Sequence, residues 1–134
     1  MASKQLQLVL VTPETTLLDE PVESLKFPLY DGQIGILPGR APLVGRLGTG
    51  ELVLETASGK RSYFIDGGFV QIKGPVVSLL TNGATPAKSL DPKVAEDELQ
   101  AVQRRHPQTD AEFATKDVDQ FRARQKLAVA RKAH

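Results

Sequence analysis

The first part of the chain alternates apolar and polar residues over short stretches, a pattern typical of β-strands with one buried face. Residues 5–11 alternate before becoming wholly apolar, and Thr12 and Pro13 end the run. Similar runs follow, separated by residues that preset a turn or tolerate positive φ. These runs cover residues 22–27, 34–37, 43–47, 51–56, 61–65, 69–73 and 76–81.

The spacing of these runs predicts the fold class of residues 1–87. No connection is long enough to hold the crossover helix of a βαβ unit, which leaves an antiparallel β-sandwich or flattened barrel. Residues 51–56 and 61–65 flank a short turn and predict a hairpin. One inner face of this hairpin is expected to include Leu52, Leu54, Tyr63 and Ile65.

Helical periodicity replaces this pattern in residues 88–134. Asp91 followed by Pro92 is typical of a helix start, and Pro107 ends the pattern about 15 residues later. Thr109 and Glu112 match a capping box, which predicts a second helix running to the C-terminus. The expected inner stripes are Ala95, Leu99, Val102 and His106 in the first helix, and Ala114, Val118, Phe121, Gln125 and Ala128 in the second.

The short connection between these helices predicts an antiparallel helical hairpin. Its stripes hold few large apolar side chains, too few to offset the conformational entropy of about 40 ordered residues. The hairpin therefore needs a partner surface, which is the sandwich, another protein, or each in turn. A permanently docked hairpin and a movable one both remain open at this point.

Composition divides the chain at the same place. All 11 glycines fall within residues 1–87, whereas residues 88–134 are rich in Ala, Lys, Arg, Gln, Glu and Asp. With 17 Lys and Arg against 16 Asp and Glu, no global field attracts nucleic acid or an anionic membrane. No apolar run reaches the length of a membrane span and the N-terminus lacks a secretory pattern, so we expect a soluble chain that stays where it is made.

Candidate chemistry is sparse. The absence of Cys excludes disulfides and thiolate sites, and His106 and His134 are isolated from other metal ligands. Gly67-Gly68 favours a tight turn over a phosphate-binding loop, because no P-loop lysine or following helix accompanies it. We therefore expect no catalytic residues, no metal and no cofactor. An enzyme with a site assembled from singly occurring residues is the least favoured class.

Basic residues gather at the end of the second helix. Residues 122–134 contain no acid and five cations, Arg122, Arg124, Lys126, Arg131 and Lys132. They form either a solvated face that complements the helix dipole or a docking site for an acidic protein segment. Nucleic acid is the weaker alternative, because no aromatic residue on which a nucleotide could stack is interleaved among these basic residues. A sandwich adaptor whose basic tail recruits an acidic partner is thus one candidate function.

Two motifs resemble the epsilon subunit of the rotary F-type ATP synthase. The family pattern Gly-x-Phe/Leu/Ile-Gly-Ile/Val-Leu-Pro-Gly-His-Ala-Pro-Leu is matched by Gly-Gln-Ile-Gly-Ile-Leu-Pro-Gly-Arg-Ala-Pro-Leu in residues 32–43. A second signature, aromatic-x-x-Gly-Gly-Phe/Ile-x-x-Val, corresponds to residues 63–72. The resemblance covers essentially the whole chain and implies a non-catalytic, central-stalk subunit with a β-sandwich and a helical pair.

This resemblance implies partners and contact residues. In the family the sandwich binds the gamma subunit and the polar loops of the membrane c-ring. It thereby helps transmit torque between ion flow and the catalytic alpha/beta hexamer. Membrane contact then arises only through the complex, at the cytoplasmic face of a bacterial inner membrane. The matching c-ring- and gamma-facing loop is Gly32, Gln33, Ile34, Arg40, Ala41, Pro42 and Leu43. Gln33 replaces the usual Glu and Arg40 the usual His, so we expect a more acidic or more neutral c-ring loop.

The resemblance also implies a regulatory role for the helices. In the family they fold against the sandwich or extend along gamma, where they restrain ATP hydrolysis. Arg122, Arg124 and Lys126 are then expected to pair with acidic segments of the beta subunit. Some bacterial members bind ATP through Ile/Leu-Asp-x-x-Arg-Ala, but Val94 here replaces the Arg that donates to phosphate. Because of this degenerate motif (Leu90, Asp91, Val94 and Ala95), we expect no tight ATP binding.

Overall fold

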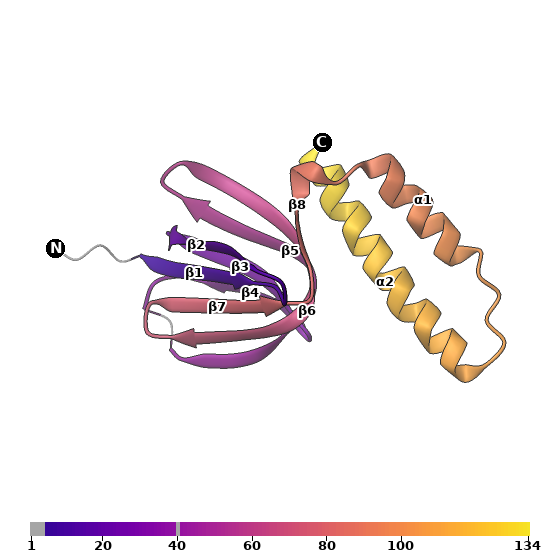
Figure 1. Cartoon of the computed structure of the whole chain (residues 1–134), viewed down its shortest axis with the longest axis horizontal. Helices are drawn as coiled ribbons and strands as arrows, with labels where there is room; N and C mark the ends of the chain where they lie inside the picture. The colour runs from indigo at the N-terminus through magenta and orange to yellow at the C-terminus, as the bar shows by residue number, and fades with distance from the viewer. Residues whose placement is uncertain (1–4, 40) are drawn as a thin grey trace. The chain divides into compact units, whose positions relative to one another are not determined.

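The computed structural model describes residues 5–39 and 41–134, which form two compact units divided after Ala84. β-Strands build the first unit and helices the second (Figure 1). The strands are β1 (Leu6–Val11), β2 (Thr16–Val22), β3 (Ser24–Leu29), β4 (Gly32–Ile36), β5 (Leu43–Thr56), β6 (Gly59–Lys73), β7 (Val76–Thr81) and β8 (Ala84–Pro86). The helices are the 3-10 turn η1 (Ala87–Ser89), α1 (Pro92–Gln103) and α2 (Asp110–Ala133).

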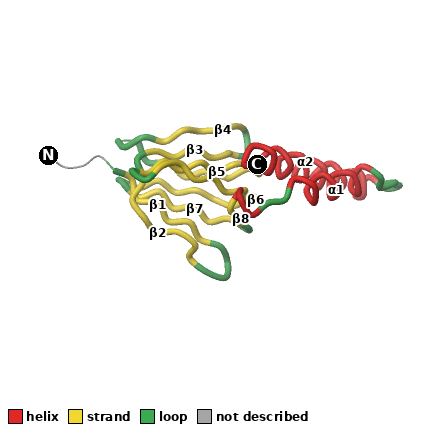
Figure 2. The backbone as a smooth tube through the Cα atoms, turned by 90° about the horizontal axis from the view of Figure 1, so that it is seen from above, coloured by secondary structure: helices red, strands yellow, loops and turns green. Residues whose placement is uncertain are grey.

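The strands form one eight-stranded sheet that folds into a flattened sandwich, as predicted; β8 spans the boundary between the two units. Its order is β2-β1-β7-β6-β5-β3-β4, with β8 pairing β6 (Figure 2). Along this order only β1 and β7 run parallel. This pair departs from the expected antiparallel pattern because nearly the whole sandwich lies between the two strands in sequence, so no tight hairpin constrains their direction.

Alternating side chains from the strands fill the core. In β1, Leu6, Leu8 and Leu10 are buried and their neighbours are half-buried, as the alternation predicts. The predicted β5–β6 hairpin is confirmed, with Thr56 paired to Gly59 across a two-residue loop. Its expected inner residues also face the core. Leu52, Leu54 and Ile65 are fully buried, and Tyr63 packs against them while half-buried.

Two predicted breaks between strands are wrong. Residues 43–47 and 51–56 belong to the single strand β5, and residues 61–65 and 69–73 to the single strand β6. Gly67-Gly68 therefore makes no turn, although both residues have positive φ, 70° and 119°. Glycine is required at position 68 because a Cβ there would lie 1.8 Å from the carbonyl oxygen of Leu80 in β7. In the predicted run 22–27, by contrast, the strand breaks at Glu23, between β2 and β3.

Both predicted helix starts are confirmed. The Asp91 carboxylate accepts a hydrogen bond from the Lys93 backbone N–H at 2.9 Å, and Pro92 is the first helical residue. The Thr109 hydroxyl accepts from the Glu112 backbone N–H at 3.1 Å. The Glu112 carboxylate in turn accepts from the backbone N–H of Gln108 at 2.8 Å, one residue before the expected partner.

The first predicted stripe is confirmed in part and the second is wrong. In α1, Ala95 and Val102 are buried and Leu99 is half-buried, but the helix ends at Gln103 and leaves His106 exposed. In α2, the predicted residues Ala114, Val118, Phe121 and Ala128 are exposed and Gln125 is half-buried. The buried residues are Ala123, Leu127, Val129 and Ala130. The aromatic side chains Phe113 and Phe121 thus point outward, while two alanines, a leucine and a valine are buried.

Polar contacts explain which face of α2 turns inward. Lys126 Nζ lies 3.2 Å from Glu98 Oε2, and Arg105 Nη1 lies 2.6 Å from Asp119 Oδ2. The Lys116 ammonium donates to the carbonyl oxygens of Gln103 and Arg105 at 3.3 and 3.2 Å. These contacts join the two helices antiparallel and select the face that holds Lys116, Asp119 and Lys126.

Candidate docking surfaces

An apolar strip crosses the outer face of the sheet. Arg46 of β5 pairs with Phe69 of β6, Phe69 with Leu80 of β7, and Leu80 with Val11 of β1. Phe69 is 62% exposed and Leu80 is 55% exposed. Their chain neighbours Val70 and Leu79 are buried in the core. Because side chains alternate along each strand, the burial of these neighbours turns Phe69 and Leu80 outward.

The outer strip, defined here as Val11, Arg46, Phe69 and Leu80, borders a hollow of about 720 Å³. Gly68 contributes to the hollow by presenting no side chain beside Phe69. Arg46 carries the only charge among the residues that line it, all of which are described. Its guanidinium carbon lies 4.6 Å from the centre of the Tyr30 ring, a cation–π contact that holds the cation at the rim. The hollow is suited to an apolar partner segment with an acidic flank.

The predicted c-ring- and gamma-facing loop is divided between two strands. Gly32, Gln33 and Ile34 lie in β4, an edge strand whose neighbour is β3, and Leu43 begins β5. Gly32, Gln33, Ala41 and Pro42 are exposed, whereas Ile34 and Leu43 pack against the core. Arg40 lies outside the described residues. Leu37, which follows β4, presents an apolar side chain that is 67% exposed.

The three cations expected to contact a beta subunit differ in their surroundings. Arg122 Nη1 lies 3.3 Å from Asp119 of the same helix, and Lys126 pairs with Glu98 of α1. Arg124 is exposed and has no ion-pair partner within residues 5–39 and 41–134. An acidic partner therefore meets Arg124 directly, but must compete with internal carboxylates for Arg122 and Lys126.

The degenerate ATP-binding motif has local structural roles. Asp91 caps α1, and Leu90 and Ala95 are buried. Val94 is 50% exposed and presents an apolar side chain where the family motif places a guanidinium. The run therefore offers a capping carboxylate and no guanidinium for a phosphate, and its one cation, Lys93, pairs with Asp97 at 3.2 Å.

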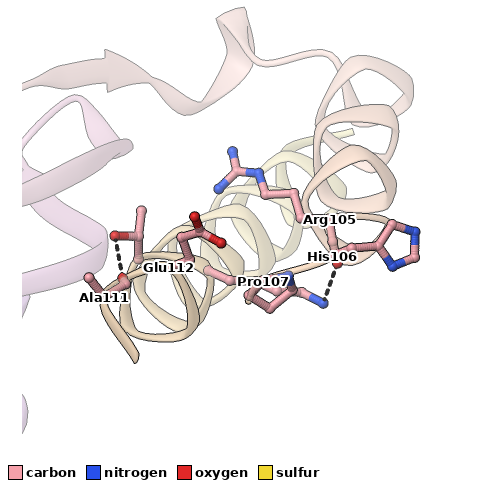
Figure 3. Close-up of a pocket in the computed structure, with 7 residues that line it drawn as sticks. Arg105, His106, Pro107, Ala111 and Glu112 are labelled. Atoms are coloured by element: carbon pink, nitrogen blue, oxygen red, sulfur yellow. Dashed lines mark hydrogen bonds between the residues drawn. The ribbon is translucent and has the colours of Figure 1, made fainter. Parts of the chain in front are cut away.

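A smaller hollow of about 330 Å³ lies at the connection between α1 and α2 (Figure 3). Its lining includes Arg105, His106, Glu112 and Lys116. Arg105 pairs with Asp119, Glu112 accepts from Gln108, and Lys116 binds two backbone carbonyls. These groups therefore stabilise the connection between α1 and α2. The described residues contain no group of three or more metal-ligating side chains and no helix suited to crossing a membrane.

Sequence patterns alone did not reveal the outer strip. Residues 76–80 are almost continuously apolar, so their alternation does not separate an inner from an outer face. The strand register determines which of these residues face outward, because it places Leu80 beside the outward Phe69. A continuous apolar run in a sheet with one solvated face is the signal that points to such a surface.

Comparison with known proteins identifies the family. A family model described as "ATP synthase, Delta/Epsilon chain, beta-sandwich domain" matches residues 5–87. The ATP synthase epsilon chain of Rhodopirellula baltica is 40% identical over 126 residues, which cover 94% of this chain and 98% of that protein. The epsilon chain of Solibacter usitatus is 34% identical over 129 residues, covering 95% and 96%.

Solved structures agree with this assignment. A chain in the mitochondrial ATP synthase of Euglena gracilis superposes with a TM-score of 0.86 at 25% identity, covering 94% of this chain and 81% of that one. A chain in the central stalk and c-ring structure from Tetrahymena thermophila shares the fold, with a TM-score of 0.71 at 14% identity and coverage of 96% and 97%. The chain therefore belongs to the ATP synthase epsilon-chain family, and it is a non-catalytic subunit.

Proposed function

We propose that the chain is a rotor subunit of the central stalk, linking gamma to the c-ring and coupling ion transport to ATP synthesis in the alpha/beta hexamer. The outer strip carries this proposal, because apolar side chains exposed next to each other on two neighbouring strands mark a protein-docking surface. The similar Euglena chain comes from a structure containing F1 and the c-ring. Association with the cytoplasmic face of a bacterial inner membrane then occurs only through the complex.

The two surfaces of the sandwich are assigned different partners. Gamma docks on the outer strip, where an acidic group on gamma pairs with Arg46 at the rim of the hollow. The c-ring loops contact the segment that begins with Gly32 and Gln33 and ends at Pro42. Polar, exposed groups at the start of β4 suit the polar loops of a c-ring, and Leu37 adds an exposed apolar side chain.

Replacing Phe69 with aspartate tests the gamma assignment. We expect Phe69→Asp to fold, because the side chain is 62% exposed, and to reduce co-purification with gamma and the alpha/beta hexamer at least tenfold. A carboxylate in the apolar strip would have to lose water on docking, which is unfavourable. The measurement is pull-down of the tagged full chain from detergent-solubilised membranes.

Phe113→Asp is the matched control, because Phe113 is 53% exposed and lies on α2, whose contact with gamma in the extended state adds to docking of the sandwich without being required for it. This variant should retain gamma at the wild-type ratio. Undiminished recovery of gamma with Phe69→Asp would contradict docking on the outer strip. Failure of the wild-type chain to recover either gamma or the hexamer would favour a free-standing adaptor over a stalk subunit.

The helical pair is proposed to regulate ATP hydrolysis. The hairpin buries few large apolar residues, and its partly exposed ion pairs join its own two helices, so they do not hold it on another surface. Such an element can separate from one surface and extend along gamma toward alpha and beta at modest cost. Arg124 then pairs with an acidic beta segment first, and Arg122 and Lys126 exchange their internal partners for it.

ATP is not expected to control this element. Titration calorimetry of the full chain should show no saturable heat at micromolar ATP, because Val94 supplies no phosphate donor. Val94→Arg tests the same explanation, because it places the missing phosphate donor at a position that is 50% exposed and accommodates a longer side chain. Saturable micromolar binding by the wild-type chain would contradict the prediction.

A further inference from the structure

The face of α2 opposite its buried residues is apolar and exposed. Phe113 is 53% exposed, Val118 58% and Phe121 53%, and Ala114 and Ala128 are exposed beside them. These residues recur at helical spacing over about four turns, or roughly 22 Å. Figure 1 shows α1 alongside α2, and the ion pairs of Lys126 and Asp119 fix which face of α2 meets α1. The exposed face therefore lies on the side of α2 that does not meet α1.

Charge is distributed unevenly along the same helix. Residues 110–119 hold four acids and one base, whereas residues 122–132 hold five bases and no acid. Four of these charges, Asp110, Asp117, Arg124 and Arg131, lie seven residues apart and therefore line the same face, because seven residues make almost two full turns. All four are exposed, and none forms an ion pair within the described residues. They give this face two unpaired charges of each sign, with Asp117 and Arg124 about 10 Å apart.

We infer that this face is a self-association surface on which α2 pairs antiparallel with α2 of a second copy. In one register Asp117 lies opposite Arg124 of the second copy, and by symmetry the same contact forms twice. That register also places Phe113 opposite Ala128 of the second copy, so a large side chain meets a small one. Phe121 then lies next to the two-fold axis, where the two rings contact each other.

The charge pattern favours this partner and this direction. Antiparallel packing places the acidic half of each α2 against the basic half of the other and also opposes the helix dipoles. Parallel packing would instead place like charges together. Because the contact is one face of a single helix, its area is at the small end for specific interfaces, so the dimer is weak and forms at high protein concentration. Salt weakens it by screening the exposed pairs.

Sedimentation of the isolated full chain tests this dimer independently of any ATP synthase partner. At low ionic strength the average mass should rise with concentration from 14.5 kDa toward twice that value. Asp117→Arg and Arg124→Asp should each weaken association at least tenfold, because both contacts between position 117 and position 124 of the second copy become repulsions. An equimolar mixture of the two variants should regain association, because both contacts between unlike partners again join opposite charges.

Arg104→Asp is the matched control, since Arg104 is exposed at the end of α1 and away from the α2 face. It should associate like the wild-type chain, and circular dichroism should show equal helicity in all variants. A monomer at every concentration would overturn the inference. So would a dimer insensitive to both single substitutions, or a mixture that fails to regain association. A negative result here leaves the rotor proposal untouched, because that proposal is tested by recovery of gamma.

Discussion

Gly68→Ala is expected to prevent stable folding of the β-sandwich. The residue lies inside β6 with φ of 119°, a backbone conformation that side chains with a Cβ rarely adopt. A Cβ there would lie 1.8 Å from the Leu80 carbonyl oxygen and 2.8 Å from the Thr81 Cα. These atoms belong to the backbone of β7, so they cannot move aside by rotating a side chain.

Relief of this clash requires β6 and β7 to separate. Their register pairs Gly68 with Thr81 and continues to Lys73 and Val76, so separation breaks central ladder hydrogen bonds. It also exposes Val70 and Leu79, which are buried in the core. We expect a loss of more than about 4 kcal/mol in the free energy of unfolding, a magnitude seen only for severe mutations.

Gly59→Ala separates the backbone strain of a positive φ from the clash with β7, the two effects that combine at position 68. Gly59 has φ of 125°, but a Cβ there would meet nothing within 4 Å. Its replacement should therefore cost only the backbone strain, about 1–2 kcal/mol. Urea unfolding followed by circular dichroism measures both variants, since the chain has no Trp. Equal losses in the two variants would show that the contact with β7 is not the main cause.

A chain that ends at Ala87 is expected to raise the ATP hydrolysis rate of the assembled ATP synthase several-fold. The sandwich core consists entirely of residues before position 80, so truncation leaves it complete. The missing residues are the helical pair that we propose restrains hydrolysis. Steady-state hydrolysis by the reconstituted enzyme, with gamma content measured in the same samples, gives the effect. An unchanged rate at full gamma content would indicate a permanently docked hairpin.

A point substitution tests the same regulation without truncation. Arg124→Glu should release part of the restraint, because Arg124 is exposed and its charge is available to an acidic beta segment. Arg131→Glu is the control, with the same charge change at another exposed position of α2. Equal rates for the two variants would argue for a general electrostatic effect instead of a specific contact.

Local patterns predicted the elements that depend on neighbours in sequence. The alternation in β1, the cap at Asp91 and the capping box at Thr109 were all recognised because each rests on residues within a few positions of one another. The spacing of the strands and the helical periodicity predicted a sandwich followed by a helical pair, the family motifs implied the same order, and both are present. Strand boundaries were less accurate, because Gly48 and Gly67 resemble turn residues when their sheet neighbours are unknown.

Tertiary structure decided the features that depend on distant residues. Gly67-Gly68 lies within a strand because close approach of β7 requires glycine there, a constraint invisible in residues 61–73 alone. The outer strip exists because register places Leu80 beside Phe69, which alternation in an apolar run cannot specify.

The orientation of α2 shows the same division most clearly. The sequence by itself determined that residues after Thr109 form a helix with apolar residues on more than one side. Which side is buried depended on contacts with Glu98 of α1 and with Arg105 of the connection that follows it, which meet Lys126 and Asp119. Helical periodicity is a local property, but the choice of the buried face is a property of the pair. The outward side thereby keeps Val118 and Phe121 exposed for a partner.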